Sequence, residues 1–160
     1  MTDLRTELRI ERVHGEAETL LQDWQYVHNL IIPADPLPLD AVRERSGRNH
    51  LEVAYLGDVL VGCSTVRPPS EDPTIATVIA RVLPEYRGRG LGALLHESNM
   101  AKARELGATA VETVVLGSNP EGLRFAEAHG FTVIEEYLLE PGDTVPWFTL
   151  SRAVDGDAQR

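Results

Sequence analysis

The sequence predicts an α/β domain with a mixed, mostly antiparallel sheet of about seven strands flanked by about four helices. Three observations carry this prediction. Short runs rich in β-branched residues recur along the chain, segments with helical spacing lie between them, and two of these segments end at a glycine, Gly107 and Gly130. The chain has 160 residues, enough for one core. We expect one domain over residues 1–152 and a flexible polar tail over 153–160.

The N-terminal part begins with a strand and two helices. Apolar and charged side chains alternate in residues 6–13, which is typical of a strand. Residues 15–30 repeat apolar side chains at helical spacing. The prolines of residues 33–38 indicate a loop, and a short second helix over 39–45 begins close to Asp40.

A hairpin and a buried strand follow. Residues 51–56 and 59–66 are predicted strands joined at Gly57-Asp58, a dipeptide that indicates a hairpin and leaves the turn type open. The β-branched run over residues 74–83 predicts a strand that is buried along much of its length, and Pro84 ends it.

The second half of the chain alternates helices and strands. In chain order we expect helix 91–106, strand 110–116, helix 119–129, strand 131–139 and strand 145–150. The last two strands flank a turn at Pro141-Gly142-Asp143. The strand–helix–strand unit over residues 74–116 should supply a parallel pair.

The formal net charge of −10 argues against non-specific binding to nucleic acid or to an anionic membrane, because it would repel both at long range. The single cysteine, Cys63, excludes an internal disulfide and a cysteine-based zinc site, and the histidines show no metal-ligand spacing. No apolar run approaches the length of a membrane helix and no secretory signal is visible, so we expect a cytoplasmic protein without a bound metal.

Positive charge lies beside glycines in the run Arg87-Gly88-Arg89-Gly90-Leu91-Gly92, between a predicted strand and a predicted helix. Glycines let the backbone approach a ligand closely, the N–H groups of a helix N-terminus point at one spot, and the arginines add charge. These features predict a site for a phosphate or pyrophosphate, with a tight turn that binds nothing as the structural alternative. The run lacks the Lys-Ser or Lys-Thr of a nucleoside-triphosphate P-loop, and its glycine spacing differs from the dinucleotide fingerprint.

Two motifs resemble the GNAT superfamily of acyl-CoA-dependent N-acyltransferases. Residues 82–92, Val-Leu-Pro-Glu-Tyr-Arg-Gly-Arg-Gly-Leu-Gly, resemble its central motif, a strand ending in V-x-P and then [QR]-x-x-G-x-[GA] opening a helix. Residues 119–131 resemble the second motif, a helix of the form N-x-x-A followed by G-F. The strong match covers residues 74–131, and the N-terminal third resembles the family in element order only.

The resemblance implies roles for individual residues. The backbone around Val82 would hold the pantetheine arm of acetyl-CoA and polarise the thioester carbonyl. The amides from Gly88 to Ala93 would bind the pyrophosphate, Asn119 would reach the pantetheine amide, and Phe125 would pack on it. Asn119 is equally a candidate for a plain helix N-cap. The implied acetyl-CoA-binding residues are Val82, Leu83, Arg87, Gly88, Arg89, Gly90, Leu91, Gly92, Ala93, Asn119 and Phe125.

Catalytic side chains are not visible where the family usually has them. Ala126 occupies the position of the tyrosine that protonates the leaving thiolate, and the strand over residues 74–82 contains no acid or histidine to serve as general base. Glu112 lies near the start of the neighbouring strand. Weaker candidates for a water-mediated route are Glu71, Asp72, Tyr55 and Tyr137. We therefore assign no catalytic residue.

The sequence thus predicts an N-acyltransferase that moves an acetyl group from acetyl-CoA to a primary amine. The absent tyrosine and glutamate motivate an alternative, a GNAT-like module that binds acyl-CoA with little or no transferase activity; a domain without a CoA site is a third hypothesis. The acceptor, the general base and acid, the acyl length and the oligomeric state are not determined by the sequence. A homodimer paired through the last two strands is compatible with it.

Overall fold

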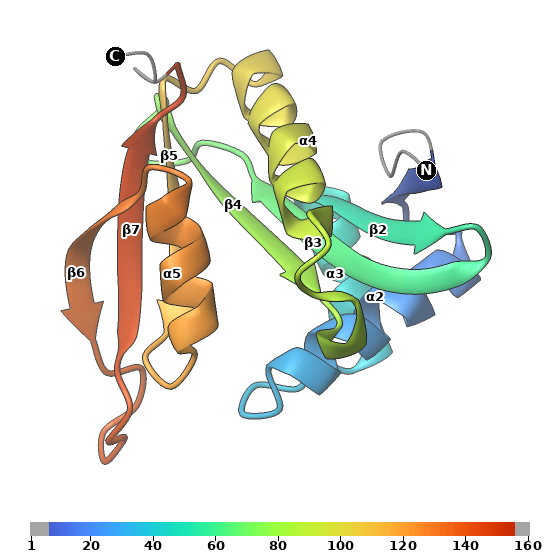
Figure 1. Ribbon diagram of the computed structural model, residues 1–160, viewed down its shortest axis with the longest axis horizontal. Helices are drawn as coiled ribbons and strands as arrows, with labels where there is room; N and C mark the ends of the chain where they lie inside the picture. Colours follow the sequence, from blue (N-terminus) through green and yellow to red (C-terminus); the bar gives the residue numbers. More distant parts are fainter. Residues whose placement is uncertain (1–6, 156–160) are drawn as a thin grey trace. The chain divides into compact units, whose positions relative to one another are not determined.

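The computed structural model describes residues 7–155. Within these residues the chain forms a seven-stranded sheet of order β1-β2-β3-β4-β5-β7-β6 and four α-helices. Figure 1 shows these elements as a ribbon coloured along the sequence. The elements are β1 (Leu8–Val13), α2 (Glu18–Ile31), α3 (Leu39–Arg48), β2 (His50–Leu56), β3 (Val59–Arg67), β4 (Ile75–Val82), the 3-10 turn η1 (Pro84–Tyr86), α4 (Leu91–Glu105), β5 (Ala110–Leu116), α5 (Pro120–Ala128), β6 (Thr132–Tyr137) and β7 (Trp147–Ala153). The predicted mixed α/β fold, with its mostly antiparallel sheet, is confirmed.

Each expected element is present, and the differences lie at the ends. Helix α3 continues three residues beyond the expected end at residue 45, where Arg48 Nε donates to a Glu44 carboxylate oxygen at 2.7 Å in an i,i+4 pair. The predicted parallel pair is confirmed: Ile75–Thr77 of β4 pairs with Ala110–Glu112 of β5.

The chain divides into two compact units, and β4 and α4 each contribute residues to both. Unit 1 contains residues 7–68 and Val78–Lys102; unit 2 contains Pro69–Thr77 and residues 103–155. The units are described separately below.

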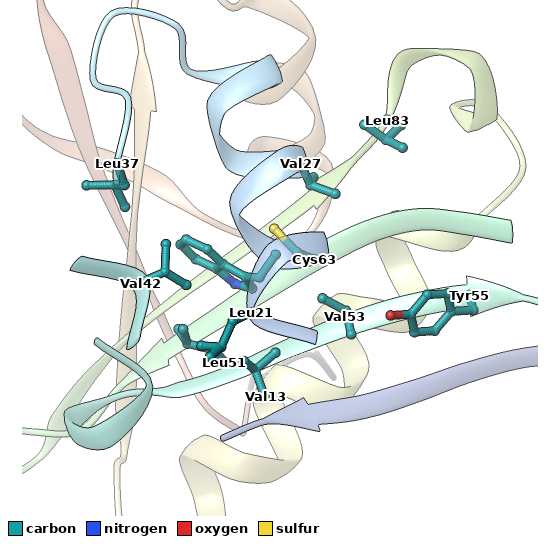
Figure 2. Packing of buried hydrophobic residues seen from close by; sticks show 11 residues of the cluster. Val13, Leu21, Val27, Leu37, Val42, Leu51, Val53, Tyr55, Cys63 and Leu83 are labelled. Carbon is teal, nitrogen blue, oxygen red and sulfur yellow. The ribbon is translucent and has the colours of Figure 1, made fainter. Parts of the chain in front are cut away.

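In unit 1, strands β1, β2 and β3 form an antiparallel ladder with a helical layer on each face. One face packs against α2 and α3 around Leu21, Trp24 and Leu51, which are at most 1% exposed (Figure 2). The other face packs Leu91 and Leu95 of α4 on the sheet. Burying a side chain of this size stabilises the fold by roughly 1.5–3 kcal/mol, so these contacts hold the first turns of α4 against the sheet.

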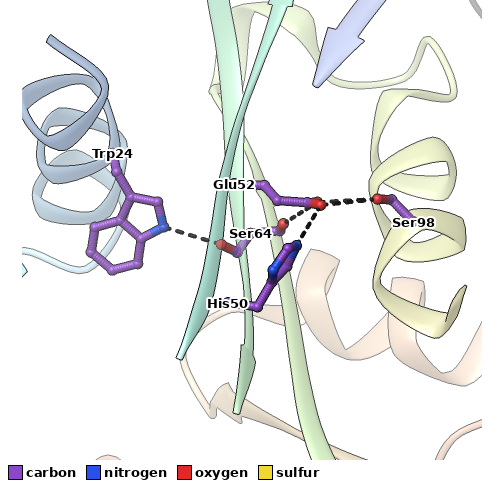
Figure 3. Close-up of polar contacts among 5 residues, drawn as sticks. All are labelled: Trp24, His50, Glu52, Ser64 and Ser98. Carbon is purple, nitrogen blue, oxygen red and sulfur yellow. Dashed lines mark hydrogen bonds and ion pairs between the residues drawn. The ribbon is translucent and has the colours of Figure 1, made fainter. Parts of the chain in front are cut away.

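A buried carboxylate links α4 to the sheet (Figure 3). The Glu52 side chain accepts hydrogen bonds from Ser64 Oγ at 3.1 Å and from Ser98 Oγ of α4 at 3.1 and 3.2 Å, and it lies 2.9 Å from His50 Nε2. On the opposite face, Trp24 Nε1 donates to the Ser64 carbonyl at 3.1 Å. The polar groups of β3 therefore connect to both helical layers.

In unit 2, β5 pairs antiparallel with β7 from Ala110↔Ala153 to Leu116↔Trp147, and β6 pairs with the other edge of β7. Helix α5 packs on β5. The Val154 amide, in the expected tail, donates to the Thr109 carbonyl at 2.9 Å. The rest of the expected tail, residues 156–160, lies outside the described residues.

Candidate active site

The strand β4 leads into α4 through a short, hydrogen-bonded connection in unit 1. The Leu83 amide donates to the Val61 carbonyl at 2.8 Å, and the Tyr86 amide donates to the Leu83 carbonyl at 2.9 Å within η1. Arg87 folds back so that its Nε donates to the Val82 carbonyl at 2.9 Å. Val82 is partly buried and Leu83 is 5% exposed, so both are packed, while Arg87 is exposed.

The glycines of the loop adopt the backbone conformation that favours glycine. Gly88 has φ of 80° and Gly90 has φ of 85°, and no atom beyond the adjoining residues lies within 4 Å of where a Cβ on either residue would stand. A side chain would therefore be strained by the backbone, because L-residues avoid positive φ. The loop shape accordingly requires glycine at both positions and leaves the space beside them open.

The loop places the N-terminus of α4 beside this open space. The Leu94 amide donates to the Gly90 carbonyl at 3.2 Å, the first bond of the helical pattern. The amides of Leu91, Gly92 and Ala93 precede that bond, and the first N–H groups of a helix have no intrahelical acceptor. With the helix dipole and the exposed side chains of Arg87 and Arg89, they form a site suited to an anion.

A close approach between β3 and β4 positions the strand that precedes the loop. Gly62 of β3 has no side chain, and a Cβ there would stand 2.4 Å from the Arg81 carbonyl oxygen and 3.4 Å from Val82 Cα. Only glycine permits this separation. Sequence reasoning did not single out Gly62, although an isolated glycine inside a strand is the usual signal of a close backbone approach.

Two predicted site residues lie in unit 2, on α5. Asn119 Oδ1 accepts a hydrogen bond from the Gly122 amide at 3.0 Å, so Asn119 is the N-cap of α5. Phe125 is partly buried, and its ring centroid lies 4.1 Å from that of His129. The remaining predicted residues, from Val82 to Ala93, lie together in unit 1.

The weaker catalytic candidates have structural contacts of their own. The Tyr55 hydroxyl donates to Asp23 Oδ2 at 2.5 Å, and burial, followed by this hydrogen bond, raises its pKa far above the ordinary value. Asp72 accepts from the Thr74 hydroxyl at 2.6 Å, which lowers the pKa of its carboxyl. Ala126 is 3% exposed and is part of the packing of α5.

Residues 81–89 contain three arginines, and the structure places Arg81 on another face of the strand than the loop arginines. Ala80 and Val82 pack with the core beneath α4, so strand alternation turns Arg81 to the opposite face, toward Cys63 and α2. Arg87 and Arg89 lie in the exposed loop. Burial raises the pKa of the Cys63 thiol to about 12, and nearby Arg81 opposes that rise. Cys63 is therefore a protonated core residue.

Within residues 7–155, no helix combines the length and apolar character that a transmembrane span requires. The search of curated protein sequences returned no match.

Several solved structures share the fold. Protein yncA from Salmonella typhimurium, solved with its cofactor acetyl-CoA, is 18% identical with a TM-score of 0.72, over 93% of this chain and 95% of that one. Ard1 from Thermoplasma volcanium is 19% identical with a TM-score of 0.75, over 94% and 99% of the two chains. An N-acetyltransferase from Staphylococcus aureus Mu50 is 13% identical with a TM-score of 0.73, over 92% and 99%.

The family model described as the acetyltransferase (GNAT) family matches residues 12–131. This range includes the strand β4, the glycine loop and helix α5 described above. The chain therefore belongs to the GNAT acetyltransferase family.

Proposed function

We propose that the protein transfers an acetyl group from acetyl-CoA to a primary amine. The observation that carries the proposal is the glycine loop at the N-terminus of α4, where Gly88 and Gly90 have positive φ and the first amides of the helix follow. A pyrophosphate is the anion that such a set of converging amides suits, and acetyl-CoA carries one. The acetyl-CoA in the related yncA structure supports the choice of donor.

Different residues of this chain would bind different parts of acetyl-CoA. The amides from Gly88 to Ala93 would hold the pyrophosphate, with Arg87 and Arg89 adding positive charge. The backbone around Val82 would hold pantetheine and polarise the thioester carbonyl. The roles that the family resemblance implies for Asn119 and Phe125, which lie in unit 2, stay predictions of the sequence.

The reaction needs little from the protein beyond orientation and a route for one proton. The amine nitrogen attacks the thioester carbon, an N–C bond forms, the C–S bond breaks, and the proton lost by the amine is balanced by the one that the CoA thiolate takes up. A thiol of pKa about 8.5 is already a fair leaving group, whereas an amine of pKa about 10.4 must be deprotonated first. The absence of a proton-donating tyrosine at position 126, where this chain has Ala126, is compatible with this chemistry.

Calorimetric titration with acetyl-CoA tests the donor site. We expect the wild-type protein to bind and the Gly90→Glu variant, which puts a side chain and a negative charge in the loop, to lose binding. Gly142→Glu is the matched control, because Gly142 also has positive φ (93°) and open space around it but lies outside the loop. Equal affinities in Gly90→Glu and Gly142→Glu would reject the assigned site.

A second candidate is an acetyl-CoA-binding module without transferase activity. It is favoured by the buried Ala126 at the tyrosine position and by β4, which has neither an acid nor a histidine. Measuring free thiol released on adding a panel of amines decides between the two candidates. Binding of acetyl-CoA without amine-stimulated thiol release would show that the protein is a binding module without transferase activity. The cytoplasmic location expected from the sequence stays a prediction.

A further inference from the structure

A group of cationic side chains lies on the α2 and α3 face of unit 1. Arg81 of β4 is partly buried on this face, beside the fully buried Cys63. Burial lowers the pKa of the Arg81 guanidinium, and the charges of Arg67 and Arg45 lower it further. These interactions show that three arginines, from β3, β4 and α3, share one neighbourhood.

The protein compensates the charges of Arg81 and Arg45 weakly. Among residues 7–155, no carboxylate forms an ion pair with Arg81 or Arg45. Asp35 is the one carboxylate that raises the pKa of Arg81, and its influence is the smallest. In a chain of net charge −10, a partly buried arginine without an ion pair is an unusual arrangement. It favours an anion supplied from outside.

His28 of α2 provides a second, independent observation in the same neighbourhood. Its side chain is 4% exposed and stacks on Trp24, with ring centroids 5.2 Å apart. Nε2 lies 3.0 Å from the Asp35 carbonyl oxygen, so Nε2 carries the proton and donates. Nδ1 is then a lone-pair acceptor, and it is buried without a hydrogen-bond partner in the described part of the chain.

The neutral form of His28 follows from the same surroundings. Burial lowers its pKa most, and Arg81 and then Arg45 lower it further, against the opposing effects of the Asp35 carbonyl and carboxylate. A ligand that brings both an anion and an N–H group would satisfy the arginines and the unused Nδ1 acceptor. An amine that bears a carboxylate has both groups.

We propose that Arg81, assisted by Arg45 and Arg67, binds a carboxylate of the acyl acceptor, and that the acceptor is an amino acid. The inference rests on the proposed acetyltransferase function. Arg81 immediately precedes Val82 in β4, and the backbone at Val82 would hold the thioester. A carboxylate on the guanidinium therefore lies within the length of one arginine side chain of that backbone. The planar guanidinium matches a carboxylate with two parallel hydrogen bonds.

Steady-state thiol release with matched acceptors tests this inference. Each amino acid is compared with its carboxamide and with the amine that lacks the carboxyl group. We expect kcat/KM for the amino acid to exceed the other two by about tenfold or more, as for a charge-assisted hydrogen-bonded pair. We expect Arg81→Gln to remove that preference by raising KM for the amino acid, with the affinity for acetyl-CoA unchanged.

Two further variants keep the test decisive. Arg45→Gln replaces a cation outside the sheet and should weaken the same preference even where Arg81→Gln fails to fold. Arg12→Gln, at an exposed arginine of β1, is the matched control and should keep the preference. Equal kcat/KM for the three acceptors in the wild-type protein, or an undiminished preference in both Arg81→Gln and Arg45→Gln, would overturn the inference and leave the acetyltransferase proposal standing.

Binding measurements separate this inference from the proposed function. If acetyl-CoA binds but no amine releases thiol, the transferase proposal fails. Calorimetric titration of the CoA-loaded protein with amino acids then tests whether Arg81 binds a carboxylate. Binding that Arg81→Gln abolishes supports the site, and no amino acid binding at millimolar concentration rejects it.

Discussion

Replacing Gly62 with alanine tests whether the close approach of β3 and β4 sets the position of Val82. A Cβ at residue 62 would stand 2.4 Å from the Arg81 carbonyl oxygen and 3.2 Å from Leu95 Cδ1. The leucine side chain can move, but the backbone oxygen moves only with its strand. Real Cβ contacts are essentially never shorter than 3.0 Å, so the two strands must separate by roughly 0.6 Å.

The magnitude follows from two opposing effects of the Gly62→Ala substitution. Forcing extra atoms into a packed interior costs about 1–3 kcal/mol. Removing glycine from a strand recovers about 0.5–1 kcal/mol of backbone entropy. We therefore expect a net loss of about 0–2.5 kcal/mol in the free energy of unfolding, together with weaker acetyl-CoA binding, because the displaced residues include Val82.

Urea unfolding followed by circular dichroism measures the first effect, and calorimetry with acetyl-CoA measures the second. Gly47→Ala is the matched control, because Gly47 lies in α3 with no atom within 4 Å of its added Cβ. It should stabilise the protein by about 0.5–1 kcal/mol through helix propensity. A Gly62→Ala protein as stable as Gly47→Ala, with wild-type acetyl-CoA affinity, would refute the assigned role of the close approach.

Three further substitutions test other contacts. Asn119→Ala removes the cap of α5 and should cost about 1 kcal/mol in thermal or urea unfolding, whereas Asn119→Asp should keep most of the stability; equal losses would contradict the capping role. Glu52→Gln replaces the charged acceptor of the Ser64 and Ser98 hydroxyls and should cost about 1–3 kcal/mol; an unchanged urea midpoint would argue against the bonded carboxylate. His28 has a lowered pKa, chiefly from burial, so the unfolded chain binds its proton more readily and stability should fall as pH drops below the ordinary value of 6.5. The free energy of unfolding, measured by urea titration at several pH values, should fall less in His28→Gln than in the wild type, by up to about 1.4 kcal/mol per pH unit. Parallel plots of that free energy against pH for the two proteins would exclude this contribution.

The glycine loop could be predicted from the sequence because its determinants are local. A positive φ excludes most residues other than glycine, so Gly88 and Gly90 mark the loop whatever the rest of the fold does. Asn119 likewise caps a helix that begins one residue later, a contact between residues three apart in sequence. Strand alternation and helical spacing located the elements for the same reason, because each period is a property of a short segment.

The polar contacts between distant segments could not be predicted in this way. Ser98 and Glu52 are 46 residues apart in sequence, and nothing near either one indicates the other. The direction of the Arg81 side chain depends on the exact register of β4, since a shift of one residue exchanges the two faces of a strand. The catalytic groups stay unassigned for a related reason, because a proton route through water leaves no local pattern of residues.

The charge of the chain places a constraint on both proposed ligand contacts. A net charge of −10 repels anionic acetyl-CoA at long range, and it also repels the carboxylate of an amino acid acceptor. At physiological ionic strength that repulsion is screened within about 8 Å, so affinity for an anion must come from groups that touch it. The loop amides with Arg87 and Arg89, and the neighbourhood of Arg81, are two such local concentrations of positive charge. The acidic surface therefore does not argue against anionic ligands; it requires that each be bound by a dedicated group of cations or amides.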